Sequence, residues 1–217
     1  VGDYNGTYTV TSSGITKTVN LSGSVTQVFE PPVITSTAFT GTYGVPLNQQ
    51  VETTNNTTSF NFIGGIIPYG ITFNTSTGVF NGIPNTAGTF IGTYTASNQA
   101  GTTAPTIITF TINKANQTLT LNDLTKGTLD APFSLPQTTN QNLPVIYSSG
   151  NTDVATVTNN IVTIVGAGTA IITASNSGNS KYNEISQTFE LTVLTIPVVS
   201  DHSIISTVGE PINYNVQ

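Results

Sequence analysis

The sequence predicts an all-β protein made of antiparallel β-sandwiches that follow one another along an elongated array. Apolar residues alternate with Thr, Ser or Asn in segments such as 106–112 and 188–193, which is the period-two pattern of half-buried strands. Turn-forming clusters, for example 56–59 and 177–180, separate these segments. The 3.6-residue period of a helix is absent, and only residues 153–155 are expected to form a single helical turn.

The composition excludes several classes of function. The chain has 217 residues, 42 Thr and 23 Asn, but no Cys, Met, Trp or Arg. Without Cys there is no disulfide, thiolate metal site or thiol nucleophile. Four Lys against ten acids give a net charge of −6, which argues against nucleic-acid binding. Although charged residues are only 6% of the chain, 36% apolar residues are enough for a core. We expect a soluble segment of a longer protein, because no apolar run has the length of a membrane span.

Internal repeats predict the domain boundaries. The segment that begins at Pro32 recurs at Pro197, with a Gly 12 residues later and a Val 19 residues later in both copies. The segment from Gly2 recurs at Gly88 and, more loosely, at Gly168. A repeat of this kind is typical of domain arrays. It predicts four pieces: the last strands of a partial domain (1–30), a complete domain (31–114), a second complete domain of another subtype (115–195) and the start of a further domain (196–217).

Four short motifs stand in order in residues 31–114: IPYGITFN from Ile67, STGVFNGIP from Ser76, TAGT from Thr86 and TASN from Thr95. They match the pattern LPxGLxF, TGxxxGxP, AGT and TAxN, with Ile67 and Tyr69 in place of commoner residues. The segment therefore resembles an immunoglobulin-like (Ig-like) repeat family of bacterial surface proteins, which implies an Ig-like sandwich.

Residues 115–195 carry LPVIYSS from Leu143, DVATV from Asp153 and a long strand segment from Val162, followed by a loop with Tyr182 between two Asn. This segment resembles the bacterial Ig-like family of intimin and invasin stalks. Alternation of the two types, with low charge and much Thr and Asn, is similar to very large Bacteroidota adhesins, including gliding-motility adhesins exported by type IX secretion. The resemblance implies an extracellular, cell-surface location.

The expected function is that of a non-catalytic stalk or spacer segment of a long secreted bacterial cell-surface adhesin or filament, which projects a distal binding region. The alternative is an accessory Ig-like or carbohydrate-binding region of a large secreted polysaccharide-degrading enzyme, and a third is a viral or other fibre protein. The expected partners are the neighbouring Ig-like domains of the same chain. Surface polysaccharide, a host or a substratum is a further expected partner, through regions outside this segment.

Catalysis and cofactor binding are not expected. The only His, His202, stands between Asp201 and Ser203, and adjacent strand residues point to opposite faces, so the three do not form a triad. A glycosidase needs two carboxylates across a groove. Nothing in the sequence places such a pair among the acids Asp123, Asp130, Asp153, Glu184 and Glu190.

Metal binding and isopeptide formation are not expected either. The five Asp form no dense calcium motif, and a carbonyl-rich site that uses Glu30 or Glu210 is the less favoured alternative to a solvated acid. Intramolecular Lys–Asn bonds need a buried Lys. All four lysines have polar or linker-like neighbours: Lys17, Lys114, Lys126 and Lys181.

Tyrosines are the candidate ligand-binding residues, because a phenol ring offers an apolar face and a polar tip to a sugar. The candidates are Tyr43, Tyr69, Tyr147, Tyr182 and Tyr214, and packing is the favoured role for most of them. Six Asn begin N-x-S/T triplets, which are glycosylation acceptors only in a suitable host: Asn5, Asn20, Asn55, Asn56, Asn74 and Asn116.

The short joints between domains predict a semi-rigid rod that does not depend on calcium. Two of the three joints contain Pro, which favours extended backbone, and Phe29 and Ile196 are candidates for apolar contacts there. At 3.3 Å per residue, residues 31–195 are expected to span roughly 70–80 Å, with the first and last strands of each domain loaded in shear. Nine residues are expected to be mostly buried: Tyr94, Phe110, Ile112, Phe133, Tyr147, Val157, Ile164, Ile172 and Leu191.

Overall fold

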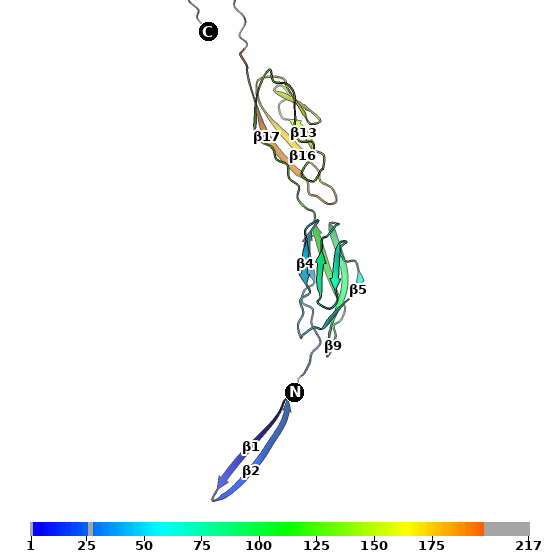
Figure 1. The fold of residues 1–217 in the computed structure, drawn as a ribbon, viewed down its shortest axis with the longest axis vertical. Coiled ribbons are helices and arrows are strands. Elements are labelled where there is room, and N and C mark those ends of the chain that lie inside the picture. Colours follow the sequence, from blue (N-terminus) through cyan, green and yellow to red (C-terminus); the bar gives the residue numbers. More distant parts are fainter. Residues whose placement is uncertain (1, 26–27, 198–217) are drawn as a thin grey trace, which may run out of the picture. The chain divides into compact units, whose positions relative to one another are not determined.

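The computed structural model describes residues 2–25 and 28–197, in which every regular element is a β-strand (Figure 1). This confirms the all-β prediction. At the expected helical turn, the N–H groups of Val154 and Ala155 both donate to the carbonyl of Asn151, at 3.3 Å and 3.1 Å, which closes a single turn before the chain enters a strand. The chain divides into two compact units. One contains the described residues up to Ala115 together with Asn179–Asn183, and the other contains residues 116–178 and 184–197.

The N-terminal hairpin consists of β1 (Gly2–Ser12) and β2 (Ile15–Val25), and each pairs with the other along its whole length. Ser13 and Gly14 form the turn with φ angles of 50° and 78°, the positive values that a two-residue hairpin turn requires. The two strands make a sheet of their own, and the described side chains on both of its faces are exposed.

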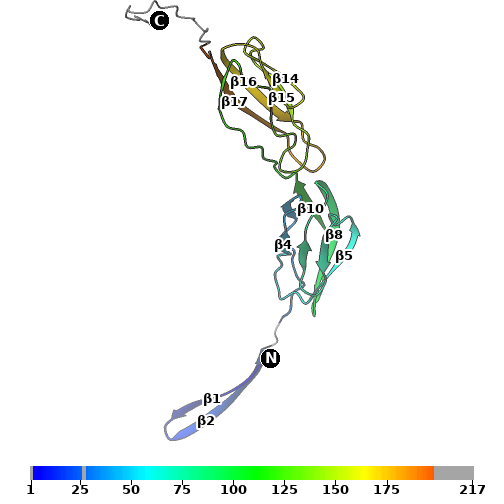
Figure 2. The ribbon, with the colours of Figure 1, turned by 45° about the horizontal axis from the view of Figure 1, so that its top comes forward.

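The first sandwich has a large sheet in the order β3-β10-β8-β5, to which the short β9 adds beside β8, and a small sheet in the order β4-β7-β6 (Figures 1 and 2). Its strands are β3 (Ala38–Thr42), β4 (Leu47–Gln50), β5 (Ser59–Gly65), β6 (Ile71–Asn74), β7 (Val79–Gly82), β8 (Gly88–Asn98), β9 (Gly101–Thr102) and β10 (Thr106–Asn113).

The core of this sandwich is aromatic. Phe80 of β7 is fully buried, and its ring lies 4.3 Å from that of Phe73 and 4.7 Å from that of Phe110, between centroids. Phe39 stacks on Phe110 at 5.5 Å. These rings come from both sheets, so the period-two pattern of the sequence places them face to face and excludes water between the layers.

The turn motif shared with the Ig-like repeat family depends on two glycines in close backbone contact. Gly82 has a φ of 144°, and a Cβ built there would lie 2.1 Å from the carbonyl oxygen of Gly70. A side chain at this position would clash with backbone, which cannot move aside cheaply. Close packing of the backbone therefore explains why this chain has glycine at these positions.

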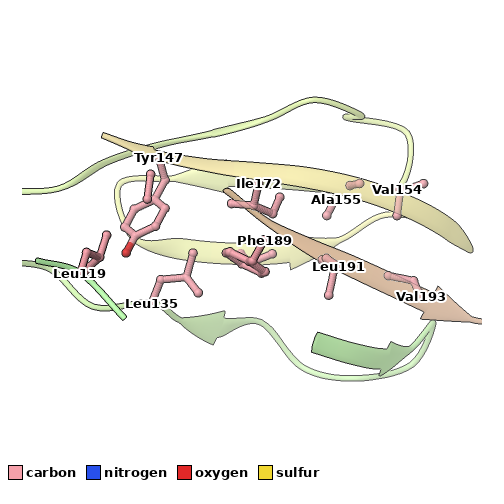
Figure 3. Packing of buried hydrophobic residues seen from close by; sticks show 12 residues of the cluster. Leu119, Leu135, Tyr147, Val154, Ala155, Ile172, Phe189, Leu191 and Val193 are labelled. Carbon is pink, nitrogen blue, oxygen red and sulfur yellow. The ribbon is translucent and has the colours of Figure 1, made fainter. Parts of the chain in front are cut away.

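The second sandwich repeats the arrangement with a sheet in the order β11-β17-β16-β13 and a sheet in the order β12-β15-β14. Its strands are β11 (Leu124–Gly127), β12 (Phe133–Ser134), β13 (Ile146–Ser149), β14 (Ala155–Thr158), β15 (Ile161–Ile164), β16 (Gly168–Asn176) and β17 (Ile185–Leu194). Figure 3 shows Ile172, Phe189 and Leu191 in the hydrophobic core between the sheets, which is mostly aliphatic.

Six of the nine expected core residues are buried: Tyr94, Phe110, Ile112, Tyr147, Ile172 and Leu191. Phe133, Val157 and Ile164 are only half-buried, although they pack against the core. All three lie on the small sheet β12-β15-β14, whose short strands leave their ends open to solvent. The register inferred from the alternation is therefore correct, and the degree of burial is lower at the sheet margins.

One pairing departs from the antiparallel expectation in both sandwiches. The first strand lies beside the last strand and runs parallel to it: β3 pairs with β10, and β11 pairs with β17. Hydrophobic alternation specifies which face of a strand is buried but not which strand lies next to it or in which direction. The sequence pattern could not have shown this pairing.

Stability is expected to fall at alkaline pH because two core tyrosines are protected from ionisation. The hydroxyl of Tyr94 donates to the carbonyl of Ser36, and that of Tyr147 donates to the carbonyl of Pro136 at 2.9 Å. Burial raises the pKa of both phenols. In the unfolded chain they lose their protons near pH 10, so stability is fully present below that value and falls as pH rises above it. Urea unfolding at about pH 8 and pH 11 measures this; changing both tyrosines to Phe should reduce the difference, whereas the exposed Tyr69→Phe should not.

Candidate functional site: the parallel terminal strands

The acids that sequence reasoning considered for catalysis do not face one another across a groove. The Asp123 carboxylate accepts a hydrogen bond from the backbone N–H of Glu190 at 2.8 Å. The Asp130 carboxylate accepts one from the N–H of Gly127 at 3.2 Å and lies 4.0 Å from the Lys126 ammonium. These acids hold backbone and a neighbouring side chain in place. His202, Asp201, Ser203, Glu210 and Tyr214 lie outside the described residues.

Within residues 2–25 and 28–197, no group of three or more His, Asp or Glu side chains is arranged to hold a metal ion. The backbone carbonyl of Glu30 accepts a hydrogen bond from the side-chain amide of Asn98 at 2.7 Å. In the same part of the chain, no helix is long and apolar enough to cross a membrane.

The four described candidate tyrosines differ in their exposure and in their contacts. Tyr147 is buried, whereas Tyr69 is 61% exposed and contacts Phe90 edge-on. Tyr43 and Tyr182, both in the first unit, make an edge-to-face contact at 5.4 Å between centroids, and the Lys181 ammonium lies 5.5 Å from the Tyr43 ring. Tyr147 is thus a packing residue and Tyr43 packs against Tyr182, whereas Tyr69 remains mostly exposed.

The lysines are exposed except for Lys126, which is half-buried. Its ammonium lies over the Phe133 ring at 5.1 Å and beside Asp130. These contacts of Lys126 do not include an Asn, which is the partner that an isopeptide bond needs. The six Asn of N-x-S/T triplets are all exposed.

The second sandwich has an open hollow of about 530 Å³ lined by Gln137, Val145, Ile146, Tyr147, Asn159 and Asn160. The Asn160 amide already donates to the Leu135 carbonyl at 2.9 Å. None of the lining residues is an Asp, Glu, Lys or His, and the hydroxyl of Tyr147 donates to the carbonyl of Pro136.

The feature with a clear mechanical consequence is the pairing of β3 with β10 in the first sandwich. Five residue pairs run from Thr109 opposite Ala38 to Asn113 opposite Thr42. Two further backbone bonds extend the pairing at its ends, because the N–H of Thr109 donates to Thr37 and the N–H of Tyr43 donates to Asn113, both at 2.9 Å. We call β3 and β10, with these two bonds, the first clamp.

The second sandwich has the same device, which we call the second clamp: β11, β17 and the bonds that extend their pairing. Four residue pairs run from Leu124 opposite Leu191 to Gly127 opposite Leu194. The N–H of Thr128 donates to Leu194 at 3.0 Å. Side chains lengthen the clamp at both ends, since Asp123 binds the N–H of Glu190 and the Thr128 hydroxyl accepts from the N–H of Ile196 at 3.3 Å.

In a parallel pair of first and last strands, a pull on the two ends of the domain acts along the strands in opposite directions. The bonds of the clamp are then loaded together and must break together. In an antiparallel pair pulled from one end, the bonds open one at a time. The geometry of each sandwich therefore resists extension between its two ends without a disulfide.

Sequence reasoning expected shear on the terminal strands but missed the side chains that reinforce them. Asn98 is one, because its amide donates to the carbonyls of Glu30 and Asn55, at 2.7 Å each, and so holds the segment before β3. Asp123 is the other. Asn98 is the last residue of β8 and Asp123 directly precedes β11, both as ordinary polar residues, and only the TAxN motif singled out Asn98.

Asp123→Ala is expected to destabilise the second sandwich by about 1 kcal/mol, the usual contribution of one hydrogen bond. The loss arises because the N–H of Glu190 loses its acceptor. Asp123→Asn keeps an acceptor oxygen and should recover most of the stability, and the exposed Asp153→Ala is the matched control. Urea unfolding measures all three. Equal stability of Asp123→Ala and the unmodified chain would show that the bond does not reinforce the clamp.

Comparison with solved structures finds similar chains at low identity. A human protocadherin-24 EC1-2 structure is 12% identical, with a TM-score of 0.39, over 76% of this chain and 99% of that chain. The protocadherin gammaB4 extracellular domain is 12% identical, with a TM-score of 0.42, over 90% and 40%. The endo-fucoidan hydrolase MfFcnA4 is 14% identical, with a TM-score of 0.32, over 90% and 34%. This chain thus spans about a third of the hydrolase.

No protein-family model matches the chain. No curated protein matches it either. The strand order of the structure itself places two β-sandwiches in tandem along one chain. The narrower resemblance to two bacterial Ig-like families remains a prediction from the motifs.

Proposed function

We propose that this chain is a non-catalytic, force-bearing spacer segment of a long extracellular bacterial adhesin or filament. The observation that carries the proposal is the clamp: in both sandwiches the first and last strands are parallel neighbours. A domain that connects its neighbours through such strands withstands tension along the chain. The bacterial surface-protein motifs and the absence of Cys from the sequence support the same role.

A spacer needs little chemistry, and the described residues are consistent with that. The acids bind backbone groups, the buried tyrosines donate to carbonyls, and the residues that line the hollow of the second sandwich include no Asp, Glu, Lys or His. The narrower expectation that the adhesin serves gliding motility and leaves the cell by type IX secretion rests on composition alone. It belongs to the proposal as a hypothesis about the whole protein.

Two measurements on the 217-residue chain test the spacer role. First, the melting temperature should be the same in millimolar calcium and in excess chelator, because carboxylates are not gathered for an ion in the described residues. Second, assays on polysaccharides, esters and peptides should give only background hydrolysis. A calcium-dependent rise in melting temperature would contradict a metal-independent spacer, and turnover that is lost on changing an acid such as Asp153 would identify an enzyme.

A further inference from the structure

The β1–β2 hairpin has one largely apolar face, which also carries Lys17 and Ser12 near the turn, and one polar face. Tyr8 pairs with Val19 and Gly6 pairs with Leu21, so their side chains share a face. The apolar side chains of this face are between 50% and 66% exposed: Tyr4, Tyr8, Val10, Ile15, Val19 and Leu21. The opposite face carries only Thr, Ser, Asn and Asp, in the described part of the hairpin. Such a pattern is typical of a sheet that is covered on one side.

The hairpin resembles the last two long strands of the first sandwich. Tyr4, Gly6 and Tyr8 of β1 have the spacing of Phe90, Gly92 and Tyr94 of β8. The partners agree in type at Gly6, which pairs with Leu21 where Gly92 pairs with Ile108. They differ at the flanking pairs, because Tyr4 pairs with Gly23 where Phe90 pairs with Phe110, and Tyr8 pairs with Val19 where Tyr94 pairs with Thr106. The hairpin is therefore built like β8 and β10.

In the sandwich, these positions of β8 are buried, except that Phe90 is half-buried. Tyr94 and Ile108 are fully buried, whereas Tyr8 is 63% and Leu21 is 61% exposed. Gly92 lies under the ring of Phe62 from β5, since a Cβ on Gly92 would be 2.4 Å from that ring. A Cβ on Gly6 would meet nothing within 4 Å. The hairpin thus lacks the covering that β8 and β10 receive from strands β3 to β7.

The covering in the sandwich has three parts. The β3 strand pairs parallel with β10, β5 pairs antiparallel with β8, and the β4-β7-β6 sheet lies over the apolar face. In addition, the hydroxyl of Tyr94 donates to the carbonyl of Ser36. The hairpin has none of these parts, because β1 and β2 pair only with each other among the described strands.

A second copy of the hairpin is too small to be the occupant of this face. Strands of 11 residues at 3.3 Å per residue, with about 10 Å for two strands, give a face of roughly 350 Å². Two such faces bury about 700 Å² together, below the roughly 1,200 Å² of a stable specific interface. A segment that covers the face and also pairs with both edges buries far more.

We propose that the hairpin is the closing strand pair of a further β-sandwich, and that its occupant is a β-sheet segment built like β3–β7. That segment places one strand parallel to β2 and one antiparallel to β1. It also lays an aromatic ring over Gly6 and offers a backbone carbonyl to the hydroxyl of Tyr8. The inference is independent of the proposed mechanical role, because it rests on the faces and pairing of the hairpin alone.

The test joins a second copy of residues 31–87 directly to Gly2 of the full chain, which places β3–β7 ahead of the hairpin as they stand ahead of β8. Amide hydrogen exchange of residues 3–24 is then compared with that of the unfused chain. We expect exchange in the fusion to slow by at least about a hundredfold, the change from a lone hairpin to a sandwich core. Exchange of the original β8 and β10 should not change.

Two substitutions in the hairpin sharpen the result. Gly6→Leu should abolish the protection in the fusion, because the ring equivalent to Phe62 needs that space, and should have no effect without the fusion. Gly23 stands where β10 has Phe110, as the partner of Tyr4, so Gly23→Phe fills the missing core volume and should increase protection only in the fusion.

Unprotected hairpin amides in both the fusion and its Gly23→Phe variant would overturn the proposal, since the second variant fills the cavity that Gly23 leaves in the core. Sedimentation of the unfused chain distinguishes the proposed segment from a second copy of this chain as the occupant. A monomer agrees with the proposal, and a stable dimer that is lost on changing Tyr8 and Leu21 to Thr would show that a second copy is the occupant.

Discussion

Phe80→Ala is expected to lower the free energy of unfolding of the first sandwich by about 3–5 kcal/mol, the range for truncating a buried Phe. Phe80 is fully buried, and its ring contacts those of Phe39, Phe73 and Phe110. These three rings come from β3, β6 and β10, so the cavity would lie between the two sheets, where the backbone cannot close it.

Hydrogen exchange and urea unfolding of the full chain measure this loss, and the core of the second sandwich serves as an internal reference. Ile91→Ala is the matched control, because Ile91 is 58% exposed on β8 and surface substitutions usually change stability by less than about 0.5 kcal/mol. A Phe80→Ala loss no larger than that of the control would mean that the aromatic cluster is not the core of the sandwich.

Thr109→Pro is expected to lower the force at which the first sandwich unfolds. The N–H of Thr109 points to β3 and donates to Thr37 at 2.9 Å. Proline removes this donor and so takes one bond from the first clamp. The matched control is Thr58→Pro, which removes the bond from the N–H of Thr58 to the carbonyl of Ser97, at 2.8 Å. That bond joins the β5 and β8 side of the sheet, away from the clamp.

Both variants should lose stability by about 1–3 kcal/mol in urea, since each leaves a carbonyl without its donor. Their mechanical behaviour should differ. When the chain is pulled by its ends in single-molecule experiments, Thr109→Pro should unfold at clearly lower force than Thr58→Pro. Equal forces would show that resistance comes from general stability and not from the clamp.

The sequence was most informative where one face of a strand is buried. The alternation in residues 106–112 predicted a strand with Phe110 and Ile112 turned inward, and β10 has both residues buried. The turn at residues 177–180 was likewise predicted by its residue types, and Gly178 has a φ of 70°. Such local features depend on side-chain period and backbone freedom, which a single sequence shows directly.

Features that depend on distant parts of the chain could not be predicted in this way. The parallel pairing of β3 with β10 joins strands that are far apart in the sequence. The role of Asp123 depends on the N–H of Glu190, which lies 67 residues later. An exposed acid looks the same in a sequence whether it is solvated or accepts such a bond, so these parts of the candidate site required the structure.

The central claim, that the parallel terminal strands let the sandwich withstand tension, is tested most directly by pulling the first sandwich in two directions. Because the chain has no Cys, introduced cysteines give unique attachment points. Val33→Cys with Lys114→Cys loads the first clamp along its strands. Ser59→Cys with Gln99→Cys pulls β5 and β8 apart from one end. All four positions are exposed.

The account predicts a several-fold higher unfolding force for the Val33 and Lys114 pair, because the bonds of the clamp must break together, whereas β5 and β8 separate one bond at a time. Stability in urea should be nearly the same for the two variants, which isolates the direction of loading as the cause. An equal force in both directions, or a lower force along the clamp, would contradict the claim.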